Sequence, residues 1–197
     1  MIYTEPAWKA LVVTTNEPLF TPEQCQLVMQ KGLSLAPVKG TVGTRLKGDN
    51  IGTHDETIRK STVSWIPFNE MPDMYREIEQ AVLATNNNHF GFEGLKMSEY
   101  AQFTQYKTGG EHYSWHMDCD MKGERQPPVR KISMTIPLVP ETDFDGGQLE
   151  FNKAGDVLRL KQGHAVFFAS FLQHRVTPVT RGTRYSLVQW FNGPSFR

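Results

Sequence analysis

The sequence predicts a mainly β fold, a sandwich or barrel supported by two helices. After Gly94 the chain consists of short runs of β-forming residues separated by turn signals, which is typical of such folds. Before it, one stretch carries the signals of a helix start, and another carries apolar residues at helical spacing. The chain has 197 residues, 39% of them hydrophobic, with 16 glycines and 12 prolines, which suits one well-buried domain with many turns. We therefore expect a single domain over 1–197, with helical and strand support in 1–94 and a β core that carries the chemistry in 95–193.

The first helix is predicted from its start signals. Thr21 can act as the N-cap, Pro22 suits the first helical position, and Gln24 completes a capping box. We expect this helix to run to about Gly32 and to pack as a support on a sheet.

The second helix is predicted from its apolar spacing. Its apolar positions recur three, four, seven and eleven residues after Met71, which marks an amphipathic helix from about Pro72 to Thr85. The run Asn86–Asn88 is expected to end it, and its methionines are expected to fill the core.

The predicted strands occupy ten segments. Turn signals lie at 145–147 and 180–183. The glycine-rich segment 39–55 has no hydrophobic period and is expected to be a loop, either a flap over a site or plain surface disorder. The strand segments are 8–14, 59–66, 95–106, 112–118, 130–139, 147–151, 156–160, 164–169, 173–179 and 184–191.

Charge and composition exclude several classes of protein. The 21 basic residues balance 21 acidic ones, so no field of one sign favours nucleic-acid or membrane binding. No apolar run approaches the roughly 20 residues needed to cross a bilayer, and the first residues do not resemble a signal peptide. Two cysteines do not make a disulfide framework. The expected location is the cytoplasm.

The segment His116-Met117-Asp118 is the first candidate for chemistry. On an extended segment, side chains two residues apart point to the same face, so His116 and Asp118 could bind one metal ion. His174 follows an apolar strand and is the candidate third ligand. Two imidazoles and one carboxylate, with open positions left for other ligands, form the facial set of non-haem Fe(II) oxygenases.

The other four histidines are weaker candidates. His54 and His89 are expected at the surface, and His164 at the end of a strand. His112 precedes His116 by four residues, which is the spacing that pairs ligands on a helix. The glycines immediately upstream of His112 argue against a helix there, so this pairing loses its force.

Arg184 is the second candidate. It lies ten residues after His174 on a strand of β-forming residues. An arginine that points into a dry sheet interior calls for a carboxylate or phosphate partner, because its planar donors match these groups in pairs. A dicarboxylate co-substrate could be that partner, and so could a carboxylate of the protein itself.

These residues form a pattern that resembles the prolyl 4-hydroxylase-type Fe(II)/2-oxoglutarate dioxygenases, and among them the PKHD-type hydroxylases of bacteria and phages. The helix start at Leu19–Cys25 is also similar to that family. The pattern consists of Tyr106-x9-His116-x-Asp118, Arg130-x7-Leu138, Gly146-Gly147-x-Leu149, and His174-x-Val-x-Pro-Val-x-x-Gly-x-Arg184-Tyr-Ser-Leu-x-x-Trp190.

The resemblance implies a double-stranded β-helix (a cupin-like jelly roll) buttressed by two or three N-terminal helices. It implies that the iron ligands are His116, Asp118 and His174. It also implies that Arg184 binds the distal carboxylate of 2-oxoglutarate and that Tyr106 hydrogen-bonds the same co-substrate. The positions that would line the substrate side are Tyr113, Arg130 and Trp190. The segment Pro137-Leu138-Val139 departs from the Tyr-Leu-Asn that is usual there.

The implied activity is a dioxygenase that uses Fe(II), 2-oxoglutarate and O2, with ascorbate as an optional reductant, to hydroxylate a substrate C–H bond. The first expected substrate is a peptidyl proline, clamped by segments 39–55 and 119–129. A free amino acid, a small metabolite, another protein side chain or a nucleobase would suit the same ligand set. Two other classes stay open: a non-catalytic jelly-roll module, and a metal-dependent isomerase in which Arg184 has no role.

Overall fold

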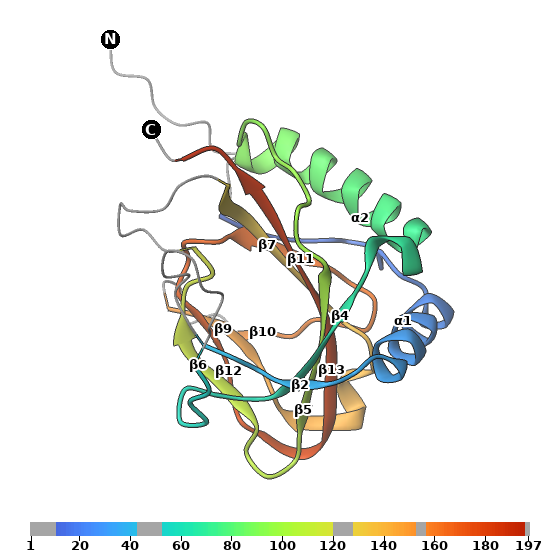
Figure 1. Cartoon of the computed structure of the whole chain (residues 1–197), viewed down its shortest axis with the longest axis vertical. Helices are drawn as coiled ribbons and strands as arrows, with labels where there is room; N and C mark the ends of the chain where they lie inside the picture. The colour runs from blue at the N-terminus through green and yellow to red at the C-terminus, as the bar shows by residue number, and fades with distance from the viewer. Residues whose placement is uncertain (1–10, 43–52, 120–127, 153–156, 196–197) are drawn as a thin grey trace.

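The computed structural model describes residues 11–42, 53–119, 128–152 and 157–195. Two antiparallel sheets form the body of the molecule, and the two α-helices lie on the outer side of the larger sheet (Figure 1). This arrangement confirms the predicted mainly β fold and the double-stranded β-helix.

The larger sheet has eight strands. Its order is β1-β11-β7-β13-β5-β4-β2, with β8 paired to β13. Both the N-terminal and the C-terminal parts of the chain contribute to it. Its strands are β1 (Val12–Thr14), β2 (Val38–Lys39), β4 (Thr62–Ile66), β5 (Ala101–Lys107), β7 (Val129–Pro137), β8 (Phe144–Gly146), β11 (Val166–Ala169) and β13 (Val179–Gly193).

The smaller sheet has five strands in the order β10-β9-β12-β6-β3. It faces the inner side of the larger sheet. Its strands are β3 (Arg59–Lys60), β6 (His112–His116), β9 (Leu149–Phe151), β10 (Val157–Leu158) and β12 (His174–Val176).

Helix α1 (Pro22–Ser34) confirms the first helix prediction. The hydroxyl of Thr21 accepts from the backbone N–H of Gln24, and the Gln24 side chain accepts from the backbone N–H of Thr21, which is the capping box. The helix packs closely on the sheet at Gly32, where a Cβ would lie 2.3 Å from the ring of Phe103. The carbonyl of Gly32 also accepts a hydrogen bond from Ser64 Oγ on β4 at 2.7 Å.

Helix α2 (Pro72–Thr85) confirms the second helix prediction, and its buried residues include Met74. The three asparagines do not stop the coil at once. They continue it as a π-helical turn, η2 (Asn86–Phe90), and the chain leaves this turn at Gly91, whose φ of 71° suits glycine. Short 3₁₀ turns lie at η1 (Phe68–Glu70) and η3 (Glu141–Asp143).

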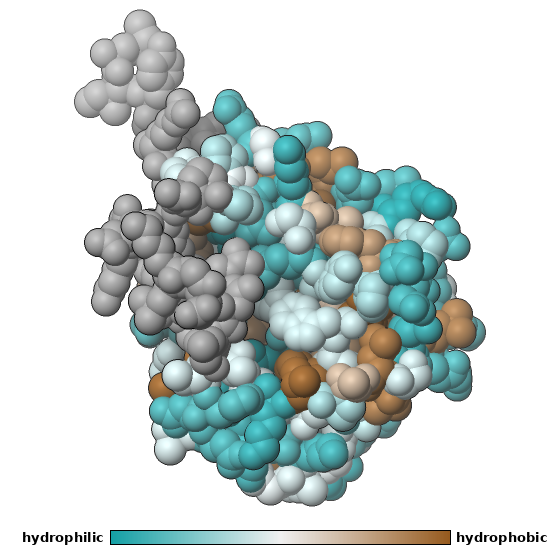
Figure 2. All heavy atoms as spheres, in the orientation of Figure 1, coloured by the Kyte–Doolittle hydropathy of each residue, from teal (hydrophilic) through white to brown (hydrophobic). Residues whose placement is uncertain are grey.

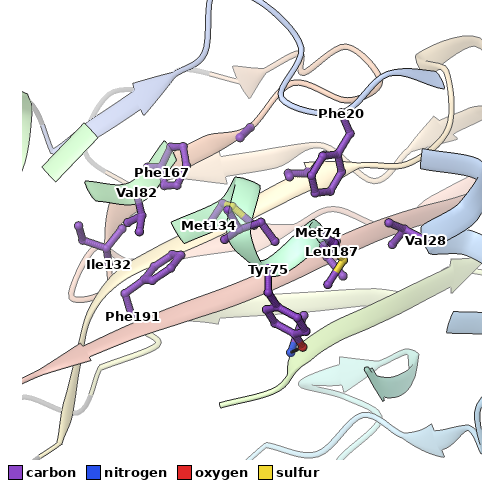
Figure 3. Packing of buried hydrophobic residues seen from close by; sticks show 14 of the residues in the cluster. Phe20, Val28, Met74, Tyr75, Val82, Ile132, Met134, Phe167, Leu187 and Phe191 are labelled. Carbon is purple, nitrogen blue, oxygen red and sulfur yellow. Dashed lines mark hydrogen bonds between the residues drawn. The ribbon is translucent and has the colours of Figure 1, made fainter. Parts of the chain in front are cut away.

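The main core fills the space between the helices and the larger sheet (Figure 3). Alternate residues of the central strands point into it, including Ile132 and Met134 of β7 and Leu187 of β13. The hydroxyl of Tyr75 on α2 donates to the carbonyl of Ile66 and accepts from the N–H of Ala101 at 2.8 Å. These bonds tie α2 to the ends of β4 and β5.

Several strand predictions need correction. The predicted turn at 180–183 is wrong, because β13 runs without a break from Val179 to Gly193. Strand β8 pairs with the first part of β13. At Gly182, whose φ is 70°, the backbone of Asp143 comes so close that a side chain on residue 182 would collide with it. Glycine here therefore serves a close pairing within a strand.

The predicted strand 59–66 divides between the two sheets: β3 pairs with β6, and β4 pairs with β5. The predicted strand 95–106 begins only at Ala101, because the residues before it form a bend and a single bridge from Lys96 to Asn192. The predicted strand 112–118 ends at His116. The remaining strands lie inside or close to their predicted ranges, and residues 8–10 of the first lie outside the described part of the chain.

The helices described are too short and too polar to cross a membrane. On the face seen in Figure 2, hydrophobic residues are scattered among hydrophilic ones.

Candidate functional site

The structure brings His116, Asp118 and His174 together between the sheets. Strand β12 pairs with β6 so that His174 lies opposite His116, and Asp118 follows two residues after β6 ends. Asp118 Oδ1 lies 3.6 Å from Nε2 of His116, and its Oδ2 lies 3.6 Å from Nε2 of His174. One ligand atom from each residue lies within 4.8 Å of the other two. Among the described residues, no other group of this kind occurs.

Both histidines present Nε2 to the centre of this set. Nδ1 of His116 lies 2.8 Å from the carbonyl oxygen of Ser114, and Nδ1 of His174 lies 2.9 Å from that of Leu172. A carbonyl oxygen can only accept, so each Nδ1 carries a proton, and in the neutral ring this leaves Nε2 with the lone pair. This is the tautomer that a metal ligand needs.

Electrostatics keep the set in its ligating state. Burial lowers the pKa of His116, and the neighbouring His174 lowers it further. Burial alone would raise the pKa of Asp118, but the two histidines, Arg130 and a hydrogen bond from Ser133 lower it below its usual value. At neutral pH His116 is therefore neutral and Asp118 is charged, as a divalent metal requires.

A register shift in the β6–β12 pair shapes the surroundings of the metal ligands. The shift lies between Tyr113 and His116, and both side chains face the interior. Their rings stack with centroids 3.4 Å apart. The ring of Phe168 packs edge-on against that of His174, with the ring centroids 4.7 Å apart. Aromatic rings therefore fix both imidazoles.

The ligand set lies on the wall of a cavity of about 560 Å³. Five alternate residues of β13 line this cavity, and the residues between them face the core or the opposite side. The five are Arg184, Ser186, Val188, Trp190 and Asn192. The predicted site residues Tyr106, Tyr113 and Arg130 line the same cavity, so the structure brings all eight predicted residues together.

Arg184 is a buried cation, 4% exposed. It donates to Ser186 Oγ at 2.9 Å and lies over the ring of Tyr106 at 5.5 Å. Burial lowers its pKa. Among the described residues, no carboxylate forms an ion pair with it. A Cβ on Gly147 would stand 2.8 Å from Arg184 Cδ, so this glycine leaves room for the arginine.

Arg130 and Trp190 form one wall with a residue that the sequence did not single out. Glu99 binds Arg130 through both carboxylate oxygens, and the Arg130 guanidinium lies 3.8 Å from the Trp190 ring centroid. The ring of Trp65 lies next to that of Trp190, with the two ring centroids 6.1 Å apart. The indole N–H of Trp190 is buried and has no acceptor among the described residues. Aromatic rings and one ion pair therefore make up this wall.

Arg59 is a second residue that sequence reasoning missed. It is buried, lines the cavity and lies over the Tyr113 ring at 4.6 Å. It donates to Ser61 Oγ and to the carbonyl of Thr41, and no carboxylate in the described part of the chain pairs with it. Its place depends on the pairing of β3 with β6, which no local sequence signal reveals.

The remaining histidines lie away from the site. His112 contacts the carbonyl oxygens of Gly110 and Thr57 and stands on a strand, as the flanking glycines indicated. His54 is exposed, His89 is half-buried, and His164 precedes β11. The two predicted clamps fall largely on 43–52 and 120–127, outside the described residues.

Comparison with known proteins gives this arrangement a context. Residues 101–192 match the model of the 2OG-Fe(II) oxygenase superfamily. A PKHD-type hydroxylase from Idiomarina loihiensis is 40% identical over 84 residues, which are 41% of this chain and 37% of that protein. One from Pseudomonas paraeruginosa is 30% identical over 122 residues, 58% of this chain and 54% of the relative. The matched region thus spans about half of these curated relatives or less.

Solved structures share the fold. A viral collagen prolyl hydroxylase from Paramecium Bursaria Chlorella virus-1, solved with 2OG, has a TM-score of 0.72 at 18% identity, covering 93% of this chain and 97% of that one. A Pseudomonas putida prolyl-4-hydroxylase has a TM-score of 0.66 at 24% identity, covering 94% of each chain. At these identities the likeness concerns the fold alone.

The donor set fits the metal of this family. Two imidazole nitrogens and one carboxylate oxygen converge beside a cavity, which suits Fe(II) with further positions for 2-oxoglutarate and O2. The motif pattern, the match over 101–192, the fold and the His-Asp-His geometry agree. Over residues 101–192 the chain is therefore similar to the 2OG-Fe(II) oxygenase superfamily, and its relatives and fold neighbours include PKHD-type and prolyl hydroxylases.

Proposed function

We propose that this protein is an Fe(II)- and 2-oxoglutarate-dependent dioxygenase that hydroxylates a substrate C–H bond, with a peptidyl proline as the first candidate. His116, Asp118 and His174 would hold the metal. The observation that carries the proposal is Arg184: a buried guanidinium without a carboxylate partner among the described residues, on the wall of the cavity that contains the metal-binding set.

An unpaired buried cation is costly, because burial removes its hydration. A dicarboxylate in the cavity would offset this cost by pairing one carboxylate with the guanidinium. The other end of the same molecule would then be free to reach the metal. A non-catalytic module, or an isomerase that needs no 2-oxoglutarate, gives Arg184 no such partner.

When bound, Fe(II) with 2-oxoglutarate and O2 would supply the oxidation, in which one oxygen atom enters the substrate and the other enters succinate as CO2 is released. The protein's own residues would bind and orient. Arg184 and Tyr106 would hold the distal carboxylate. Tyr113 and Phe168, which pack on the two histidines, would keep water from the metal side of the cavity.

The substrate side is supported by the opposite wall. Trp65 and Trp190 line the cavity and offer flat apolar surfaces that suit a pyrrolidine ring. Arg59 adds a buried cation that can bind a second carbonyl or a carboxylate. Strands from both 1–94 and 95–193 enter both sheets, which supports a single catalytic domain.

The test is incubation of the protein with Fe(II), ascorbate, 2-oxoglutarate and a panel of proline-rich peptides. Succinate is measured together with the mass of each peptide. We expect succinate formation coupled to a peptide product heavier by one oxygen atom, and neither product with His174→Ala. Matched peptides with alanine in place of proline serve as controls.

Two other outcomes would change the proposal. Succinate formation without any modified peptide, but with modification of free amino acids or small metabolites, would replace the peptide by a small-molecule substrate. No succinate above the His174→Ala level with any substrate would contradict the oxygenase itself.

A further inference from the structure

Two buried serines lie behind Asp118. Ser133 Oγ lies 2.7 Å from Asp118 Oδ2, and Ser170 Oγ lies 2.9 Å from Ser133 Oγ. Neither serine is exposed to solvent. Ser133 stands on β7 in the middle of the larger sheet, between Phe168 of β11 and Trp190 of β13. Its backbone therefore has hydrogen-bonded strands on both sides.

The direction of the hydrogen bonds follows from the chemistry of the groups. A charged carboxylate can only accept, so Ser133 must give its single hydroxyl hydrogen to Asp118. The hydroxyl of Ser170 must then donate to Ser133. The result is a directed chain from Ser170 through Ser133 to Asp118, in which each bond polarises the next.

Ser170 also holds the backbone of the same ligand. Its carbonyl oxygen accepts from the N–H groups of Asp118 and Cys119, both at 3.0 Å. The main chain of Asp118 and its carboxylate are thus anchored on one residue. Asp118 Oδ1, which lies 3.6 Å from Nε2 of His116, accepts no hydrogen bond among the described residues, whereas Oδ2, which lies 3.6 Å from Nε2 of His174, is already bound by Ser133.

We propose that Ser133 is a positioning residue for the metal site: it binds Oδ2 of Asp118 and so presents Oδ1 to the metal, and Ser170 orients Ser133 for this task. The inference rests on the proposed role of Asp118 as a metal ligand. Groups that hydrogen-bond metal ligands typically contribute a factor of about 10 to 100 in metal affinity or activity, because they fix the ligand before the metal arrives.

The experiment is anaerobic titration of the whole protein with Fe(II), and separately with Co(II), whose visible ligand-field spectrum reports the geometry of its ligands. Ser133→Ala should weaken binding of both metals by about 10- to 100-fold and change the Co(II) spectrum. Ser133→Thr keeps the hydroxyl and should restore wild-type affinity. Ser170→Ala should weaken binding less, and the double alanine variant should be no weaker than Ser133→Ala, because both serines act along one path.

Ser64→Ala is the matched control. Ser64 is also a fully buried serine on a strand of the larger sheet, and its hydroxyl donates to the carbonyl of Gly32, away from the metal-binding set. It should lose stability to thermal unfolding while keeping metal affinity and the Co(II) spectrum unchanged. This comparison separates a positioning effect from general loss of a buried hydrogen bond.

The outcomes distinguish the inference from the function on which it rests. Failure of the wild-type protein to bind either metal, or undiminished binding by Asp118→Ala, would contradict the proposed metal site. Tight binding by the wild type together with equal binding by Ser133→Ala and Ser64→Ala would overturn only the role of Ser133. If Ser133→Ala does not fold, Ser170→Ala decides, and affinity equal to that of Ser64→Ala would overturn the inference.

Discussion

Replacing Arg184 by glutamine should separate 2-oxoglutarate binding from metal binding. The substitution removes the positive charge and keeps a polar side chain beside Ser186. Arg184 is 4% exposed and has no carboxylate partner among the described residues. In the proposed complex it pairs with the distal carboxylate of the co-substrate, so its loss should act on that ligand alone.

The magnitude follows from the burial of the pair. Truncating one partner of a buried, hydrogen-bonded charge pair typically costs about 2–5 kcal/mol. Since each 1.4 kcal/mol is about tenfold, the Kd for 2-oxoglutarate should rise at least about 30-fold. Arg184→Lys keeps the positive charge but loses the paired donors of the guanidinium. Its Kd for 2-oxoglutarate should therefore lie between those of the wild type and Arg184→Gln.

The assay is thermal unfolding under anaerobic conditions with metal, with and without 2-oxoglutarate. At about 100 times its Kd a ligand stabilises the native state by about 2.7 kcal/mol, which corresponds to a rise in Tm of roughly 5–11 °C for a domain of this size. We expect this full shift in the wild type and about a third of it or less in Arg184→Gln at the same concentration. Without ligand, the glutamine variant should be at least as stable, because an unpaired buried cation is gone. A 2-oxoglutarate Kd within about threefold of wild type would refute the reasoning.

Three further outcomes follow. Gly147→Ala should weaken 2-oxoglutarate binding without changing metal affinity, because its Cβ would stand 2.8 Å from Arg184 Cδ; unchanged binding in the anaerobic titration would contradict this. Arg59→Gln should raise the KM for the organic substrate severalfold, as measured by succinate release, and should raise the Kd for 2-oxoglutarate much less than Arg184→Gln does, as measured by anaerobic titration. Tyr75→Phe should lower the free energy of unfolding by about 1–3 kcal/mol in urea, since two buried backbone groups lose a partner. Burial raises the pKa of Tyr75 to about 12, so its contribution should be present below about pH 10 and lost as pH rises towards 12, a decline that the phenylalanine variant should lack.

The helices could be predicted because their signals are local. Thr21, Pro22 and Gln24 specify the start of α1 within four residues, and the apolar period of α2 lies within its own length. Strand boundaries depend on partners far along the chain. The segment 180–183 is expected to be a turn because it contains Gly182. In the structure Gly182 pairs with β8 and belongs to a long strand.

The site was predictable to the extent that its residues form a sequence pattern. Spacing alone suggested that His116 and Asp118 could share a metal, although the reason was partly wrong, because Asp118 lies beyond the end of β6. His174 reaches them through strand register, which the sequence does not reveal. Glu99, Arg59 and Ser133 have no local signal, because each acts through a neighbour at least 15 residues away.

The charges that line the cavity suggest an order of binding. Among the described lining residues, Arg130 and Glu99 neutralise each other, which leaves Arg59 and Arg184 against the single negative charge of Asp118. A divalent metal at Asp118 would increase this positive excess, and a dianion such as 2-oxoglutarate would reduce it again. In a cavity of low dielectric constant, such changes in charge alter the binding energy of an ion more than they would in water. The co-substrate should therefore bind more tightly after the metal than before it, and by linkage the metal should bind more tightly in the presence of 2-oxoglutarate. Titrating each ligand with and without the other measures the same coupling twice, and equal affinities in both series would show that the cavity does not use its charge in this way.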